Sequence, residues 1–340
     1  MHGVILGNLE IGSGPSTPGA MIELLGQPLR SWLPIDWDQL PSAMGDLVVI
    51  DDGELTDEAF DIGSSYLEAL FDPVSGGLDG GRDWLPSWAW QTAEQTEHAI
   101  YKRLSGGSQE DYVAGRLMLV EVTAGTTEAI LREYDRRRAP RMDVYVPIPP
   151  ERVWNGKDAT WWWPCPDCQY PMRLAGSELR CDFAPHRRVG RFVLSAGVDR
   201  AKAPVVLNAK ASVRAQRAEG VVCLEWAVWR HMTVPGLTEV ALMLWLEGKG
   251  AAVERWEAMD AWDLGVTLPD GWACRVDVKD RADSRDIIAK PPRAEFIVVP
   301  SYRADQVEEI RRGLDRDRYT VCTAARFKSI VTSRLGGGAR

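Results

Sequence analysis

Residues 261–280, AWDLGVTLPDGWACRVDVKD, alternate apolar and polar side chains on both sides of a short turn. The segments 262–268 and 272–280 have the composition and the period of two that are typical of β-strands. Between them, Leu268-Pro269-Asp270-Gly271 places proline and glycine where β-turn geometry favours them. The sequence therefore predicts an antiparallel hairpin here.

Three charged residues in this hairpin predict a metal site. Asp277 and Lys279 are two positions apart and share one face of their strand, and Asp263 lies on the partner strand. Two carboxylates that converge repel each other unless a cation lies between them, which indicates a hard divalent ion, Mg²⁺ or Mn²⁺. Lys279 would help to activate water and offset the charge of a phosphate. The alternative is the solvent-exposed face of a half-buried strand.

The residues that flank the hairpin predict a mixed α/β domain. Residues 222–247 have a helical pattern, broken at Pro235-Gly236, and the second part carries Glu239. Apolar runs at 294–302 and 319–324 predict strands, and 304–314 predicts a helix between them. Glu239 is a candidate third acidic residue of the site, although Glu225 and Glu247 lie in the same helical region.

A second candidate site is the cysteine cluster WWWPCPDCQYPMRLAGSELRCDFAPHRR. Cys165, Cys168, Cys181 and His186 have the form Cys-x2-Cys-x12-Cys-x4-His. Thiolates and an imidazole are the ligands of structural zinc, and MRLAGSELR predicts the hairpin that returns the second pair. Four protein ligands leave no position for a reacting water, so we expect structural Zn²⁺. The alternative is three reduced cysteines packed among tryptophans.

Length and composition exclude several classes of protein. The 340 residues are 45% apolar and 26% charged, as in soluble globular proteins of two or three domains. The sequence has no long uncharged apolar run and no basic, apolar leader at its start, so we expect a cytoplasmic protein that does not enter a membrane. Six cysteines are too few for a disulfide scaffold.

The charge is unevenly distributed. Residues 1–100 hold seventeen acidic side chains against two arginines, whereas residues 180–217 hold nine Lys or Arg against two Asp. A local excess of positive charge predicts contacts with a nucleic-acid backbone, the alternative being an ordinary solvated face. The candidate residues are Arg187, Arg188, Arg191, Arg200, Lys202, Lys210 and Arg214. Earlier in the chain, residues 55–135 have helical periodicity, with a helix start at Thr126 and Thr127.

The order of these features resembles a known nuclease superfamily. A glutamate on a helix, an aspartate on one strand and Asp-x-Lys on the next are similar to the PD-(D/E)xK pattern, with Trp262 where the name of the motif has proline. More narrowly, VYVPIPP, WPCPDCQYPM, VWRHMTVPGLTEV, AMDAWDLGV and VDVKD resemble the restriction-endonuclease-like protein of the pPIWI-RE islands, over about residues 140–325. The resemblance assigns Glu239, Asp263, Asp277 and Lys279 to catalysis, with Mg²⁺ at the two aspartates.

These features together predict a multidomain α/β (α+β) chain. The periodicity predicts a mainly helical domain at 1–142, the cysteine spacing predicts a zinc-ribbon-like module at 143–195, and the resemblance implies a restriction-endonuclease-like αβββαβ core at 196–340. The resemblance also implies a Mg²⁺-dependent endodeoxyribonuclease, the effector of an antiviral or anti-plasmid defence system. The expected partners are DNA and other proteins of the operon, including Piwi-like and helicase components. The resemblance leaves open whether the chain forms a homodimer. The alternative is a catalytically inactive, zinc-containing adaptor that binds nucleic acid or protein.

Overall fold

The computed structural model of the chain describes residues 17–33, 42–51, 53–56, 58–59, 102–187, 192–195, 203–207, 213–281 and 284–337. These residues fall into two compact units. The first comprises Met1–Asp79 with Arg281–Asp283, and the second comprises Gly80–Asp280 with Ser284–Arg340. The predicted boundaries at residues 142 and 195 stay a prediction.

The first unit contains short elements in its described residues. They are α2 (Pro18–Leu25), the 3₁₀-helix η1 (Leu29–Ser31), α3 (Ser42–Gly45), β1 (Ile50–Asp51) and β2 (Glu54–Leu55). Helix α2 begins at Thr17, whose hydroxyl accepts a hydrogen bond from the amide of Ala20, as is typical of an N-cap residue. Strands β1 and β2 pair antiparallel.

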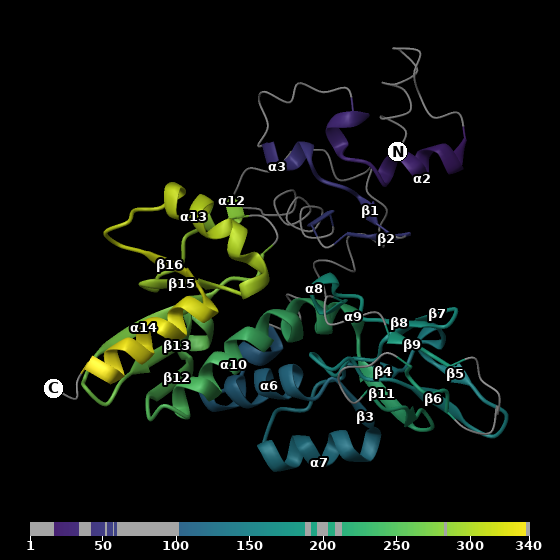
Figure 1. The fold of residues 1–340 in the computed structure, drawn as a ribbon. Coiled ribbons are helices and arrows are strands. Elements are labelled where there is room, and N and C mark those ends of the chain that lie inside the picture. The colour runs from purple at the N-terminus through teal and green to yellow at the C-terminus, as the bar shows by residue number, and fades with distance from the viewer. Residues whose placement is uncertain are drawn as a thin grey trace, which may run out of the picture. The chain divides into compact units, whose positions relative to one another are not determined.

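The second unit is built around a mixed sheet, which in the described residues has five strands (Figure 1). The strands, in spatial order, are β12 (Ala252–Trp256), β13 (Trp262–Thr267), β14 (Ala273–Val278), β15 (Phe296–Val299) and β16 (Thr320–Thr323). The first three pair antiparallel and the last three pair parallel. The predicted hairpin is confirmed as β13 and β14, and Gly271, with φ of +84°, supplies the backbone conformation of its turn.

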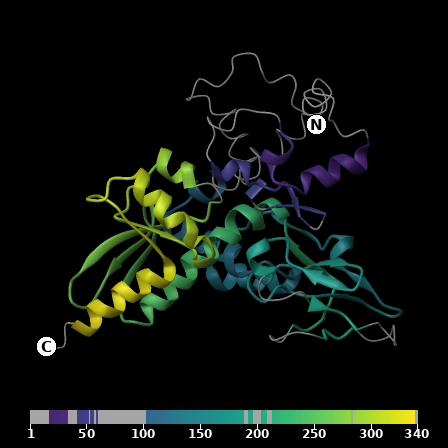
Figure 2. The same ribbon diagram turned by 45° about the horizontal axis from the view of Figure 1, so that its top comes forward.

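Helices cover both faces of this sheet (Figures 1 and 2). On one face, α10 (Val234–Glu247) and α14 (Ala324–Gly337) pack on Leu264, Val276 and Val298. On the other, α12 (Ser284–Ala289) and α13 (Val307–Gly313) pack on Ile297 and Val299 of β15. Alternate side chains of β15 thus enter different cores, as the period of a strand requires.

The remaining elements of this unit precede that sheet in the chain or, for α11 and η6, connect its strands. The helical ones are α6 (Gln109–Glu121), α7 (Thr127–Arg137), η4 (Pro150–Arg152), α8 (Ala184–Arg187), α9 (Trp226–Val228), η5 (Trp229–Thr233), α11 (Glu257–Asp260) and η6 (Ser301–Gln306). The strands are β3 (Ala124–Thr126), β4 (Tyr145–Pro147), β5 (Trp154–Asn155), β6 (Thr160–Trp162), β7 (Arg173–Ala175), β8 (Glu178–Arg180), β9 (Phe192–Val193), β10 (Gln216–Arg217) and β11 (Val221–Leu224).

The predictions for the helical regions have mixed outcomes. The stretches at 109–121 and 127–137 are helices, and the side chain of Thr126 caps the second as predicted. The predicted helices between residues 60 and 100 lie outside the described residues. No helix in the described part of the chain has the length and apolar character needed to span a bilayer.

The prediction for residues 222–247 is wrong in two respects. Residues 221–224 form strand β11 between β3 and β4, because a short apolar run such as VVCL fits a buried strand as well as a helix. The helix is also not broken at Pro235, which lies in the first turn of α10, directly after the π-helix η5. The backbone is helical from η5 into α10, and the proline follows a π-turn in which the amide of Val234 donates to the carbonyl of Trp229, a place where a helix can accommodate proline without ending.

Candidate active site and metal centre

Strands β13 and β14 bring the three predicted residues of the hairpin together. Asp263 and Asp277 are both buried, each with 6% of its surface exposed. The carboxylate of Asp263 accepts a hydrogen bond from the amide of Val278 (2.6 Å), and Nζ of Lys279 lies 2.6 Å from Oδ1 of Asp277. The side chain of Lys279 keeps a third of its surface exposed. The two carboxylates are thus held by their strands, and the ammonium group reaches solvent.

Burial governs the protonation of these groups. It raises the pKa of Asp263 well above its ordinary value, and the nearby carboxylates of Glu239 and Asp277 raise it further. Burial also raises the pKa of Asp277, although Lys279 opposes the shift. For Lys279, burial lowers the pKa, but the carboxylates of Asp277 and Asp263 outweigh it and raise the pKa overall. The lysine is therefore a cation at neutral pH.

Glu239 of α10 is buried beside this pair and is already paired (2% exposed). Both of its carboxylate oxygens accept hydrogen bonds from Nη2 of Arg116, at 3.0 and 2.9 Å. Its Oε2 also accepts one from the indole of Trp256 (2.6 Å). Burial raises the pKa of Glu239, whereas Arg116 lowers it. Glu239 is thus next to the predicted metal-binding pair, but its oxygens are engaged by other side chains.

Sequence reasoning missed two charged residues of this site, Arg116 and Asp260. Nη1 of Arg116 contacts Oδ2 of Asp260 at 2.6 Å, and its Nη2 lies 3.9 Å from Oδ1 of Asp263. The one signal in the sequence is that Arg116 interrupts the apolar run of a helix, at VAGRLMLV. Its partner Glu239 is 123 positions away, so no local pattern could have identified the contact.

We refer to Glu239, Asp260, Asp263 and Asp277 as the acidic cluster. In the described residues, four carboxylates meet two cations, Arg116 and Lys279, which leaves two negative charges when all six groups are ionised. Oδ1 of Asp260 is buried and accepts no hydrogen bond from any described residue. This charge and these oxygen donors fit a hard divalent cation. Mg²⁺ is commonly bound through one or two carboxylates and several waters, so Asp263 and Asp277 stay its predicted ligands.

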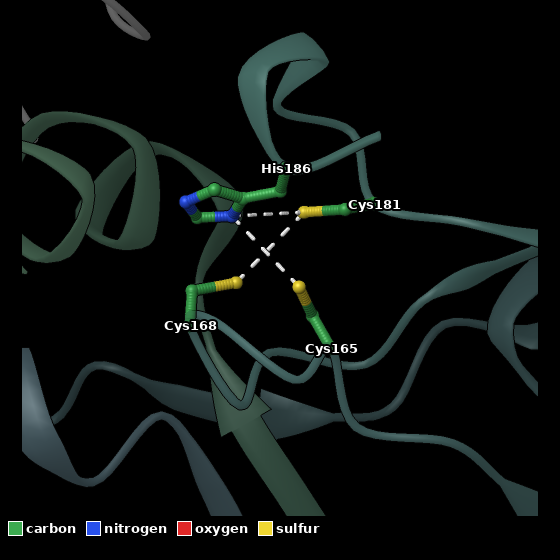
Figure 3. A group of neighbouring side chains, drawn as sticks. All are labelled: Cys165, Cys168, Cys181 and His186. Atoms are coloured by element: carbon green, nitrogen blue, oxygen red, sulfur yellow. Dashed lines mark hydrogen bonds between the residues drawn. The ribbon is translucent and has the colours of Figure 1, made fainter. Parts of the chain in front are cut away.

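The cysteine cluster forms a second site, and the four predicted residues converge (Figure 3). Their sulfur and Nδ1 atoms all lie within 4.8 Å of one another. Sγ of Cys168 is 3.8 Å from Sγ of Cys181, and Nδ1 of His186 is 3.6 Å from Sγ of Cys181 and 3.8 Å from Sγ of Cys165. Tetrahedral zinc ligands at about 2.3 Å from the ion are themselves about 3.8 Å apart. The four side chains can therefore hold a metal ion.

Local structure explains this convergence. Cys165 and Cys168 lie on a tight turn, in which the amide of Gln169 donates to the carbonyl of Cys165 (2.8 Å). Strands β7 and β8 form the predicted hairpin, with Gly176 at its tip in the left-handed conformation (φ +61°), and lead to Cys181. Helix α8 then supplies His186.

The metal centre is attached to the rest of the second unit by buried contacts. Thr123 donates to the carbonyl of Cys168 (3.0 Å), and Tyr170 stacks on Trp229 with ring centroids 4.5 Å apart. Phe183 packs edge-on against Tyr302 of η6. These contacts connect the cysteine cluster to η5, which directly precedes α10, and to η6.

The predicted nucleic-acid contacts stay largely without structural description. Arg214 is exposed. The side chain of Arg187 and the whole of Arg188, Arg191, Arg200, Lys202 and Lys210 lie outside the described residues.

Comparisons with known proteins match two parts of the chain. Residues 236–339, from α10 through α14, match the family model described as "REase associating with pPIWI_RE". Residues 1–126 match the model described as "pPIWI_RE three-gene island domain Y". No curated protein and no solved structure matches the chain. The two family matches identify the chain as a protein of the pPIWI-RE islands with a restriction-endonuclease-like domain in its C-terminal part.

Proposed function

We propose that the chain is a Mg²⁺-dependent endonuclease that hydrolyses DNA as the effector of a pPIWI-RE defence island. The observation that supports this proposal is the convergence of Asp263, Asp277 and Lys279 at one end of the hairpin, within the segment that matches a restriction-endonuclease family. An adaptor protein has no need of buried carboxylates that repel one another, because such groups destabilise a fold unless a cation compensates them.

The residues have distinct roles in this proposal. Asp263 and Asp277 would hold the ion, which when bound supplies positive charge next to the scissile phosphate. The side chain of Lys279 is 33% exposed, against 8% for that of Asp277, and its ammonium group would orient the attacking water and offset negative charge on the phosphate. Removal of a single preorganised group of this kind typically slows a reaction by two to three orders of magnitude, as a rough guide.

We also propose that Cys165, Cys168, Cys181 and His186 bind Zn²⁺ in a structural role. A closed set of four ligands has no position for a reacting water, and zinc accepts thiolate and imidazole ligands in this geometry. In the same protein, the basic region at 180–217 would contact the phosphate backbone, and the first unit and further proteins of the island, Piwi-like and helicase components, would regulate the nuclease.

A cleavage assay tests the function. Wild type, Asp277→Asn and Lys279→Ala are incubated with supercoiled plasmid and with single-stranded DNA in Mg²⁺ or Mn²⁺, with and without the products of neighbouring island genes. We expect cleavage by the wild type that both variants lose by at least about a hundredfold. Asp317→Asn and Lys249→Ala alter exposed residues of the same types and are the matched controls.

The outcomes separate the nuclease from the alternative function. Cleavage by both active-site variants at the wild-type rate contradicts the assignment. Wild-type protein that binds DNA but has no Mn²⁺ site dependent on Asp263 and Asp277 would instead support the zinc-containing adaptor.

A further inference from the structure

Helix α6 presents three polar residues to the acidic cluster from one of its faces. Gln109, Tyr112 and Arg116 are spaced three and four positions apart, so they lie above one another on the helix. Tyr112 is fully buried, and its hydroxyl accepts a hydrogen bond from Nη1 of Arg116 (3.0 Å). Helix α6 lies outside the segment that matches the nuclease family and within the one that matches island domain Y. Two separately matched parts of the chain therefore meet at one site.

Arg116 divides the acidic cluster into two pairs of carboxylates. Its guanidinium group bonds to both oxygens of Glu239 and contacts Asp260 at 2.6 Å, while its nearest approach to Asp263 is 3.9 Å. The planar guanidinium presents its donors as a rigid fork that fits this arrangement, whereas an ammonium group is a compact point charge without that fixed geometry. Glu239 and Asp260 thus share the single positive charge of Arg116 and keep one negative charge between them. Asp263 and Asp277, beside Lys279, are the carboxylates left for an ion.

Gln109 holds the segment that carries Asp260. In this segment Trp256, Ala258, Met259 and Asp260 have positive φ, from +45° to +84°, a conformation that non-glycine residues adopt only when their surroundings enforce it. The side-chain amide of Gln109 donates to the carbonyls of Arg255 (3.2 Å) and Trp256 (2.7 Å) and accepts from the amide of Met259 (3.0 Å). These three hydrogen bonds connect α6 to the strained turn directly before β13.

We propose that Gln109 and Arg116 are positioning residues of the nuclease site, and that Arg116 reserves Asp263 and Asp277 for a single divalent ion by pairing with Glu239 and Asp260. The metal part of this inference rests on the proposed nuclease function. The position of α6 then determines the geometry of the site, so a nuclease domain without this helix lacks part of its own active centre.

A comparison of Mn²⁺ binding and cleavage tests the role of Arg116. In Arg116→Gln, loss of the nearby positive charge should strengthen Mn²⁺ binding at least about tenfold, because a cation no longer competes for the cluster. Cleavage should fall at least about tenfold, because Glu239 and Asp260 are free to draw the ion from its place. Arg116→Lys should bind Mn²⁺ nearly as the wild type does and still lose cleavage. Arg132→Gln, in an exposed ion pair of α7, is the matched control.

If Arg116 serves only folding, a folded Arg116→Gln variant should bind Mn²⁺ as tightly as the wild type or more weakly. That result would overturn the inference. If Arg116→Gln does not fold, Arg116→Lys provides the test. Cleavage by Arg116→Lys at the wild-type rate would also overturn the inference. Wild-type protein without an Mn²⁺ site would count against the proposed function as a whole.

Amide hydrogen exchange without metal tests the contact of Gln109 independently of catalysis. Gln109→Ala should speed exchange at Met259 at least about tenfold, because the acceptor of that amide is removed. Exchange at an unchanged rate would refute the role of α6 in holding the turn, whether or not the protein is a nuclease.

Discussion

Replacing one partner of the buried ion pair between Arg116 and Glu239 should destabilise the fold, and the effect should differ between the two partners. The side chains are 8% and 3% exposed, and breaking a buried pair of this kind costs about 3–5 kcal/mol, because one charge stays buried without its partner. Glu239→Gln leaves Arg116 charged, although Asp260 still contacts it, so we expect a loss of about 3 kcal/mol. Arg116→Met leaves a carboxylate, which can take up a proton instead.

The two variants should therefore differ in their dependence on pH. Burial already raises the pKa of Glu239, and removal of Arg116 takes away the largest interaction that lowers it. A carboxyl group whose pKa is higher in the folded than in the unfolded state favours folding at low pH, and this contribution is lost as the pH rises through the folded pKa. The destabilisation by Arg116→Met should thus shrink as the pH falls toward about 4.5, whereas that by Glu239→Gln should not.

Urea unfolding of metal-free protein, followed by tryptophan fluorescence at several pH values, measures both effects. With a slope of about 3 kcal/mol per molar urea, a loss of about 3 kcal/mol lowers the midpoint by about 1 M. Glu308→Gln, in an exposed pair with Arg311, should change stability by less than about 0.5 kcal/mol. The reasoning would be refuted if both buried-pair variants lost the same free energy of unfolding at every pH. It would also be refuted if either lost no more than the exposed control.

Three further changes have defined outcomes. Cys181→Ala should reduce bound zinc from about one ion per chain to a small fraction, by elemental analysis, and equal zinc in both proteins would disprove the site. Gly236→Ala should destabilise the protein by about 1–3 kcal/mol in urea unfolding, because its Cβ would lie 2.4 Å from Val120, and unchanged stability would argue against this close packing of α6 on α10. Because burial raises the pKa of Asp263 and Asp277, Mn²⁺ affinity measured by calorimetry should rise with pH above about 4, and affinity independent of pH would contradict it.

The sequence predicted those parts of the fold that depend on neighbouring residues. The hairpin of β13 and β14 and the turn of Cys165 and Cys168 are each specified by a short segment, in which turn residues and periodicity agree. The convergence of Asp263 with Asp277 followed from strand pairing, because the predicted turn fixes which residues face one another. The catalytic and metal-binding roles of these aspartates stay predictions.

Long-range contacts account for what the sequence did not reveal. Arg116 meets Glu239 through the packing of α6 on α10, and the left-handed turn at 256–260 is stabilised by Gln109, about 150 positions away. Neither contact has a local pattern. Strand β11 was misread because both of its partners, β3 and β4, come from distant segments, and tertiary pairing decides between strand and helix for a short apolar run.

An anomalous difference map from crystals soaked in Mn²⁺ tests the central claim most directly. The account predicts one strong peak at about 2–2.5 Å from carboxylate oxygens of both Asp263 and Asp277, with Lys279 beside it and Arg116 still paired with Glu239. Loss of this peak in Asp277→Asn would confirm the ligand. A map with no peak at these two carboxylates, or with manganese bound elsewhere in the chain, would contradict the account.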